Sequence, residues 1–224
     1  MANYGAILVD EYGIPFSTPD TTPMSLVSKN VYNFGGSGGD INLAVSVSSP
    51  FVVAFKSDVT GVYGRLSNNS GVYTLTVGRL AGGSVGNVTV YIFGIVIPQP
   101  KPAWGIAINN AQGQCILTNE TKVMNPPIAV GTPGNPANLG YNIDTILSGN
   151  YAVMPQMTGL MVGVIHSGGA TRPFQSPIQT YAYFNGSTTR ISSTQTVSPG
   201  GDQLENVGYA NSNDLIYALD VSAY

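Results

Sequence analysis

Apolar and polar residues alternate along most of the chain, in short runs separated by clusters of glycine, proline and asparagine. A period of two is typical of a β-strand with one buried face. No stretch keeps a helical period over several turns, so we expect very little helix. The pattern predicts strands at residues 5–9, 25–34, 41–47, 51–55, 59–66, 72–79 and 87–97, and then at 151–154, 160–166, 179–184, 188–196 and 215–221.

Residues 4–24 and 104–124 resemble each other. An aromatic residue opens each segment, an apolar run follows, and Asp10 or Asn110 stands three positions before a turn glycine. This order is typical of a β-hairpin whose turn needs the conformational freedom of glycine. A repeat at so long a distance indicates a duplicated domain. The identical pairs are Gly5/Gly105, Gly13/Gly113, Thr18/Thr118, Thr21/Thr121 and Met24/Met124.

The predicted fold is all-β, with two antiparallel β-sandwich-like domains in tandem. The first domain is expected at 1–97, a proline-rich linker at 98–103 and the second domain at 104–224. The segments 90–93 and 216–219 look like related closing strands. Residues 125–142 carry four prolines and three glycines, so we expect a long structureless loop without a counterpart in the first half. We expect the first domain to dock and the second, through this loop, to contact a partner.

Charged residues are only 8% of the chain, against about 25% in ordinary soluble domains. The eight basic residues are scattered and the net charge is −3, which excludes a basic patch for nucleic acid. We expect no secretory signal, and the longest apolar run, 88–97, is about half of what a membrane span needs. We therefore expect that the protein is made in a cytoplasm and does not insert into a membrane. Scarce charge weakens the protection of sheet edges and favours a place in an assembly.

One set of residues has the order of a hydrolase triad. Ser84 lies between Gly82 and Gly86 with nucleophile-elbow spacing, and Asp144 and His166 follow. An elbow needs a helix after the serine, whereas a strand-like sequence follows Gly86. We therefore interpret this segment as a hairpin loop and predict no catalytic residues and no enzyme.

Metal and sugar sites have weaker signals. The segment 35–40 resembles a calcium-binding nonapeptide in a single copy, and His166 with Cys115 are too few for zinc, so we expect no metal and no cofactor. Cys115, in an apolar run, is expected to be buried. Tyr181 and Tyr183 near Asn185 are either a sugar-stacking surface or half-buried strand residues. The adjacent carboxylates Asp10 and Glu11 do not define a glycosidase pair, and glycosylation patterns begin at Asn68, Asn87, Asn119 and Asn185.

The opening segments, 3–13 and 104–113, resemble the start of small tail-associated structural proteins of tailed bacteriophages. This resemblance implies a non-enzymatic virion protein of the tail tip or tail fibre. We expect it to assemble symmetrically with copies of itself, as a trimer, and to contact other virion proteins. Contact with a host surface receptor belongs to the same expectation. The alternatives are a capsid decoration protein and a carbohydrate-binding adhesin. An enzyme would require Ser84, Asp144 and His166 to meet.

Overall fold

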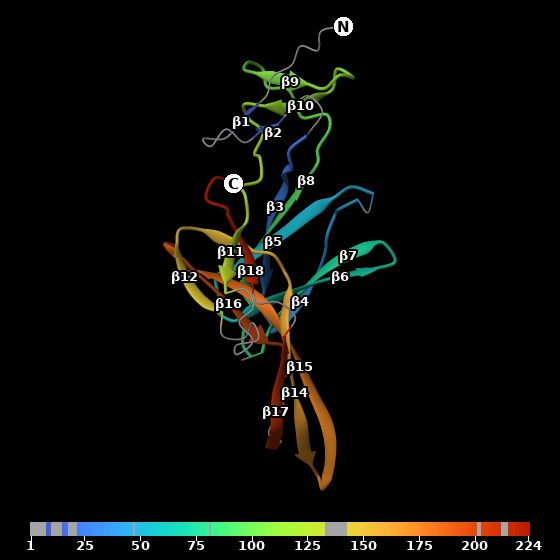
Figure 1. Cartoon of the computed structure of the whole chain (residues 1–224), viewed down its shortest axis with the longest axis vertical. Coiled ribbons are helices and arrows are strands. Elements are labelled where there is room, and N and C mark those ends of the chain that lie inside the picture. Colours follow the sequence, from blue (N-terminus) through green and yellow to red (C-terminus); the bar gives the residue numbers. More distant parts are fainter. Residues whose placement is uncertain are drawn as a thin grey trace.

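The computed structural model describes residues 8–9, 15–17, 22–46, 48–80, 82–132, 143–200, 203–211 and 215–224. These residues form an all-β fold without a helix, as the alternating pattern predicts (Figure 1). The strands of the first half are β1 (Leu8–Val9), β2 (Pro15–Ser17), β3 (Ser25–Phe34), β4 (Gly38–Asn42), β5 (Phe51–Ser57), β6 (Val62–Asn69), β7 (Val72–Arg79) and β8 (Gly86–Gly94). Those of the second half are β9 (Ala107–Asn109), β10 (Cys115–Thr118), β11 (Ile128–Gly131), β12 (Asp144–Ser148), β13 (Tyr151–Val153), β14 (Met157–Ser167), β15 (Ala170–Phe184), β16 (Thr188–Gln195), β17 (Gln203–Asn211) and β18 (Leu215–Asp220).

The central layer is one antiparallel run of strands in the order β3-β8-β5-β13-β18-β11. The first three strands come from the first half of the chain and the last three from the second. They join at β5 and β13, where Val153 pairs with Phe55. Since hydrogen bonding continues from one half to the other, the predicted tandem arrangement of two separate sandwiches is not confirmed.

The two halves of this layer have the same pairing. Ser28 pairs with Ile92 in the first half, and Ile128 pairs with Ala218 in the second, so the positions are related by 100 (28 to 128) and by 126 (92 to 218). Strands β5 and β13 obey the same shifts. Their corresponding pairs are Phe51–Gly94, Val52–Phe93 and Val53–Ile92 in the first half, and Tyr151–Asp220, Ala152–Leu219 and Val153–Ala218 in the second.

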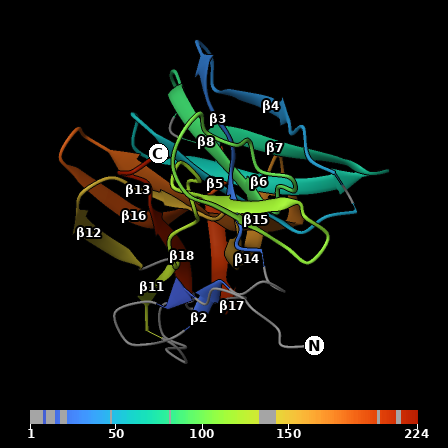
Figure 2. The ribbon, with the colours of Figure 1, turned by 90° about the horizontal axis from the view of Figure 1, so that it is seen from above.

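A smaller sheet covers the central layer in each half. Its order is β4-β7-β6 in the first half, where it is a separate sheet, and β12-β16-β15 in the second, where β15 also joins the central layer through the parallel pairing of Tyr183 with Ser57 of β5. Adding 116 to the bounds of β7 (72 and 79) gives those of β16 (188 and 195), so Leu75 corresponds to Ile191, and both are fully buried. Viewed from above, β4, β6 and β7 lie on one side and β12 and β16 on the other (Figure 2). Each half is thus a two-layer unit, called here the first and second repeat, and one hydrophobic cluster includes residues of both.

The opening hairpins also correspond, which confirms the sequence repeat in this region. Leu8 pairs with Ser17 and Val9 with Pro15 in β1–β2, while Ile108 pairs with Leu117 and Asn109 with Cys115 in β9–β10. Each residue differs from its counterpart by 100, and the register shifts at the same place in both hairpins. Both hairpins lie at one end of the molecule (Figure 1), called here the hairpin end.

The second repeat differs from the first by an arm of β14, the first part of β15 and β17. The first repeat has only residues 58–61 between β5 and β6, and 80–85 between β7 and β8. At the corresponding places the second repeat has β14 with residues 170–177 of β15, and β17. The arm projects from the body opposite the hairpin end (Figure 1).

The predicted loop at 125–142 is wrong in part. Ile128–Gly131 is strand β11, which pairs with β18 and is the counterpart of part of β3. A strand formed there in spite of the surrounding prolines because the edge of β18 offers a partner at the register that the repeat requires. Residues 133–142 lie outside the described residues.

Three further differences concern strand positions. The strand predicted at 41–47 lies at Gly38–Asn42, because the two glycines are held against β7 by the sheet despite their low strand propensity. Strands β12 and β17 were not predicted, and β15 begins nine positions before the predicted 179 (179 − 170). Pro173 and Pro177 interrupt the pattern there, and they are tolerated because this part of β15 pairs on one side only.

Candidate interaction surfaces

The turn of the second hairpin depends on a side chain that caps the backbone. Asn110 Oδ1 accepts hydrogen bonds from the backbone N–H groups of Gln112 (3.1 Å) and Gln114 (2.9 Å). Gly113 has φ +76°, which favours glycine. An Asx side chain is suited to accept these bonds, so the capping explains why Asn110 precedes the turn glycine of the second hairpin.

Gly105, the other repeated glycine of this hairpin, is required because the side chain of Asn119 lies close to its Cα. Gly105 has φ +133°, and a Cβ on it would lie 2.1 Å from Asn119 Oδ1. That oxygen accepts a hydrogen bond from Ile106 N at 3.1 Å, which holds both ends of the hairpin together. The residues on either side of Gly105 point into solvent: Trp104 is 85% exposed and Ile106 is 70% exposed. The aromatic–glycine pair therefore places the chain's single tryptophan at the surface.

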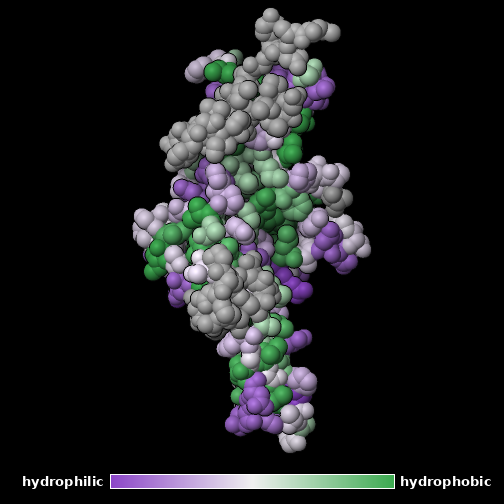
Figure 3. Space-filling view, viewed as in Figure 1, coloured by the Kyte–Doolittle hydropathy of each residue, from purple (hydrophilic) through white to green (hydrophobic). Residues whose placement is uncertain are grey.

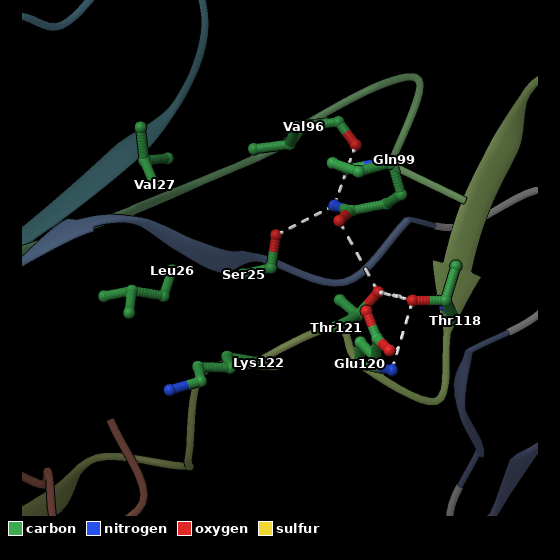
Figure 4. A pocket seen from close by; sticks show the side chains of 10 residues that line it. Ser25, Leu26, Val27, Val96, Gln99, Thr118, Glu120, Thr121 and Lys122 are labelled. Carbon is green, nitrogen blue, oxygen red and sulfur yellow. Dashed lines mark hydrogen bonds between the residues drawn. The ribbon is translucent and has the colours of Figure 1, made fainter. Parts of the chain in front are cut away.

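A hydrogen-bonded joint fastens this hairpin to the body. Gln99 Nε2 donates to Ser25 Oγ and to the carbonyl oxygen of Val96, both at 3.0 Å, and Thr121 Oγ1 donates to Gln99 Oε1 (Figure 4). Thr121 Oγ1 also accepts from Thr118 N at 2.9 Å. These side chains line a hollow of about 400 Å³. Both Nε2 hydrogens of the buried Gln99 amide are used in hydrogen bonds within the chain. We therefore infer that the joint orients the hairpin relative to the body.

The two repeats meet at this joint about a local two-fold axis. Met124 N donates to Met24 O, Ser25 bridges Val123, and Leu26 N donates to Lys122 O. Residues 24 and 124 are counterparts in the two repeats, so exchanging the two repeats leaves the Met24–Met124 pair in place. The antiparallel pairing of β5 with β13 fits the same relation, since Val153 pairs with Phe55 and positions 154 and 54 come next in that register.

Tyr224 closes the same region. Its hydroxyl donates to Val123 O at 2.6 Å and accepts from Asn125 N at 2.8 Å, while Lys29 Nζ donates to its main-chain oxygen. Its ring packs edge-on against Phe93. Burial raises the pKa of the Tyr224 hydroxyl. The segment that carries the second hairpin is thus fixed on both sides.

Apolar surface gathers beside the joint. A hollow of about 300 Å³ next to β3 and β8 has no charged residue in its lining, and Val27, Ile95 and Ile97 contribute to it while remaining partly exposed. Trp104 and Ile106, on the segment of the second hairpin, are exposed as well, and protein partners often cover exposed apolar side chains of this kind.

The arm is a second surface. Met161, Ile165, Phe174 and Leu204 make a small core, which Ile178 of the body closes at the base of the arm. Figure 3 shows hydrophobic residues along the arm and hydrophilic ones towards its tip. At the tip, His166 Nδ1 bonds Thr171 Oγ1 at 2.8 Å and His166 Nε2 lies 3.4 Å from Glu205.

The three residues with triad order are engaged separately. Ser84 Oγ donates to Phe34 O at 2.7 Å, and Asp144 pairs with Arg190, whose Nε donates to it at 2.7 Å. This hydrogen bond holds the pKa of Asp144 below its ordinary value. His166 lies on the arm beside Glu205. Among the hydrogen bonds of the described residues, none joins Ser84, Asp144 and His166.

The other predicted positions have structural surroundings. Cys115 is buried, as predicted. Asp40, in the calcium-like segment, accepts a hydrogen bond from Thr76 Oγ1 at 2.7 Å. Tyr181 is only 6% exposed, so the sugar-stacking interpretation is wrong for this residue, and Tyr183 is half-buried. The described residues contain no group of three or more His, Cys, Asp or Glu side chains that could hold a metal ion. Asp10 and Glu11 lie outside the described residues.

Comparisons with known proteins found no match. No family model, no curated protein and no solved structure is similar to this chain at the level searched. No helix in the described part of the chain is long and apolar enough to cross a membrane.

Proposed function

We propose that this chain is a structural component of a bacteriophage virion, in the tail tip or tail fibre region, that acts through protein–protein assembly rather than catalysis. The observation that carries the proposal is the pair of corresponding hairpins at one end of the molecule, with the exposed Trp104 and Ile106 on the second hairpin. The sequence of these hairpins carries the resemblance to tail-associated proteins. Tryptophan is one of the residues enriched among the binding hot spots near the centre of protein interfaces.

The geometry supports a division of roles between the two ends. The hairpin end docks to the particle, because its joint fixes the orientation of an apolar surface. The arm reaches away from the docked body and contacts a neighbouring virion protein, a host surface receptor or further copies of the chain, in an assembly predicted to be threefold. This replaces the expectation that the first repeat alone docks, since both repeats contribute a hairpin to the same end (Figure 1).

The capsid decoration protein remains the second candidate, because the same two-ended geometry would suit it. An adhesin that stacks sugars on Tyr181 loses its main support, since that ring is buried.

The test uses purified particles produced from the genome that encodes this chain. Quantitative mass spectrometry should detect the chain in a fixed ratio to the major tail protein, and immunogold labelling should place it on the tail. Label on the capsid shell would favour decoration, and its absence from particles would contradict the proposal. Trp104→Ser should reduce incorporation at least tenfold, while the matched control Val72→Ser, at another exposed strand residue, should leave it unchanged.

A further inference from the structure

β3 is the outermost strand of the central layer on the side of the first repeat. β8 pairs with one side of it from Ser25 to Phe34. On the opposite side, the described residues supply a partner only at its start, where Ser25 bridges Val123. Below the register shift between Leu26 and Ser28, the pairing with β8 is regular, so the stretch 28–34 presents an unbroken edge of backbone donors and acceptors.

This edge lacks the features that protect other edges of the molecule. On the arm, Pro173 removes a donor from the open side of β15, and β17 has a bulge with Asn206 at φ +51°. In contrast, residues 28–34 contain neither proline nor glycine and have one charged residue, Lys29. Val31, at the centre of the stretch, is 61% exposed. Edges that remain open in this way are templates for strand addition.

We propose that the open edge of β3 pairs with β3 of a second molecule of this chain, antiparallel about a two-fold axis at Val31. Two features favour this occupant. The same edge already receives an antiparallel segment of its own chain, Lys122 to Met124, and the new contact continues that interface. The chain also joins its two repeats by antiparallel pairing of corresponding strands, β5 with β13.

The lengths of the two outer edges decide the symmetry. β11, which corresponds to β3 at the other end of the layer, has only four residues, against ten in β3. Pairing of β3 with β3 therefore buries the long edge of both molecules and closes this contact at two molecules, whereas β3 with β11 would leave most of the β3 edge open. The threefold contacts proposed for the particle use the arm and not this edge. Centred on Val31, the register places Lys29 opposite Asn33 of the second molecule, and the two Lys29 residues are four positions, or about 13 Å, apart. This contact does not depend on the virion role.

The experiment measures the mass of the full chain by size-exclusion chromatography with light scattering at about 50 µM. Wild type should elute with twice the chain mass, and Val31→Lys should shift it to the monomer mass, because two ammonium groups would face each other at the axis. Val72→Lys is the matched control, since Val72 is 50% exposed on β7 and should leave the dimer intact.

A second variant tests the same contact through the gain of a covalent bond, so the conclusion does not rest only on the loss of the dimer. Val31→Cys should form a covalent dimer under mild oxidation, seen on a non-reducing gel and reversed by a thiol, whereas Val72→Cys should not. Wild type that is monomeric or trimeric at this concentration would overturn the proposal. A dimer that survives Val31→Lys and gives no Val31→Cys cross-link would overturn it as well.

Discussion

The first and second repeats share strand order, pairing register and the places of core residues, but only the second carries an arm. In the first repeat, residues 58–61 and 80–85 connect the two layers directly. In the second repeat, the insertions at both places pair with each other through β14 and β17. Two separate insertions that form one sheet indicate that the body tolerates changes at this end, while the opening hairpins keep the same register in both repeats and the joint fixes the second of them.

The largest effect is expected from corresponding core residues. Leu75→Ala and Ile191→Ala should each lower the free energy of unfolding by about 3 kcal/mol, because both side chains are fully buried in a shared cluster. Urea unfolding should show a single transition for both variants. Val72→Ala, at an exposed site of the same strand as Leu75, is the control and should change little. Two separate transitions would show that the repeats fold independently.

The hairpins allow a test of the repeated glycine. Gly105→Ala should destabilise by about 1–3 kcal/mol, since its Cβ would meet Asn119 Oδ1 and its φ favours glycine. Gly82→Ala separates the two causes, because Gly82 also has a positive φ but open space around it. Hydrogen exchange at Ile106 should increase in Gly105→Ala only. Equal melting temperatures for both variants would contradict the role of the close approach.

A pair of corresponding tyrosines differs in environment. Tyr91 is fully buried and its hydroxyl has no hydrogen-bond partner among the described residues, whereas its counterpart Tyr217 is 39% exposed. Burial raises the pKa of Tyr91 to about 12. Tyr91→Phe should leave stability at pH 7 unchanged or raise it by up to about 1 kcal/mol, because it removes a buried, unpaired polar group.

The pH dependence gives a second readout for Tyr91. The hydroxyl ionises near pH 10 in the unfolded chain but near pH 12 in the folded protein, so the free energy of unfolding is unaffected by this group below pH 10 and falls as the pH rises from 10 towards 12. The melting temperature of the wild type should therefore fall steeply between pH 10 and pH 12, and that of Tyr91→Phe should fall less. Tyr217→Phe should keep the wild-type slope, and a flattened slope in that variant would reverse the assignment.

The smallest effect concerns two corresponding aspartates, Asp40 and Asp144. Asp144 pairs with Arg190, which lowers its pKa, whereas Asp40 accepts from Thr76. The Asp144 contribution is present above its unfolded value near 3.8 and is lost as the pH falls below it. Because the pair is about half exposed, Asp144→Asn should cost less than about 1 kcal/mol at pH 7 and nothing at pH 2. A cost that persists at pH 2 would assign it to packing instead.

The sequence was sufficient for the all-β class, for the opening hairpins and for the relation between the closing strands. Gly105, Gly113, Thr118 and Thr121 were visible because local geometry demands these residue types. β11 was missed because its sequence is proline-flanked and its strand conformation depends on β18. Of the arm, the strand predicted at 160–166 lies within β14, but the first part of β15 was missed because Pro173 and Pro177 indicate a loop unless the pairing of the strand on one side is known.

The candidate surfaces were less accessible to prediction than the fold. Trp104 was noticed as part of the repeat, but its exposure follows from Gly105 and Asn119 meeting in space. The open edge of β3 depends on which strand ends the sheet, and alternation within residues 25–34 does not contain that information. In contrast, the triad order of Ser84, Asp144 and His166 was visible, while the partners that engage each of them were not.

The most direct test of the duplication with an inserted arm is a chimera. Residues 158–177 are replaced by residues 58–61 of the first repeat, and residues 196–211 by residues 80–85, so that the second repeat receives the connections of the first. The chimera should remain soluble, unfold in one transition, and keep slow hydrogen exchange in β5, β8, β13 and β18. A chimera without cooperative unfolding, or with lost protection in these strands, would contradict the claim that the body is complete without the arm.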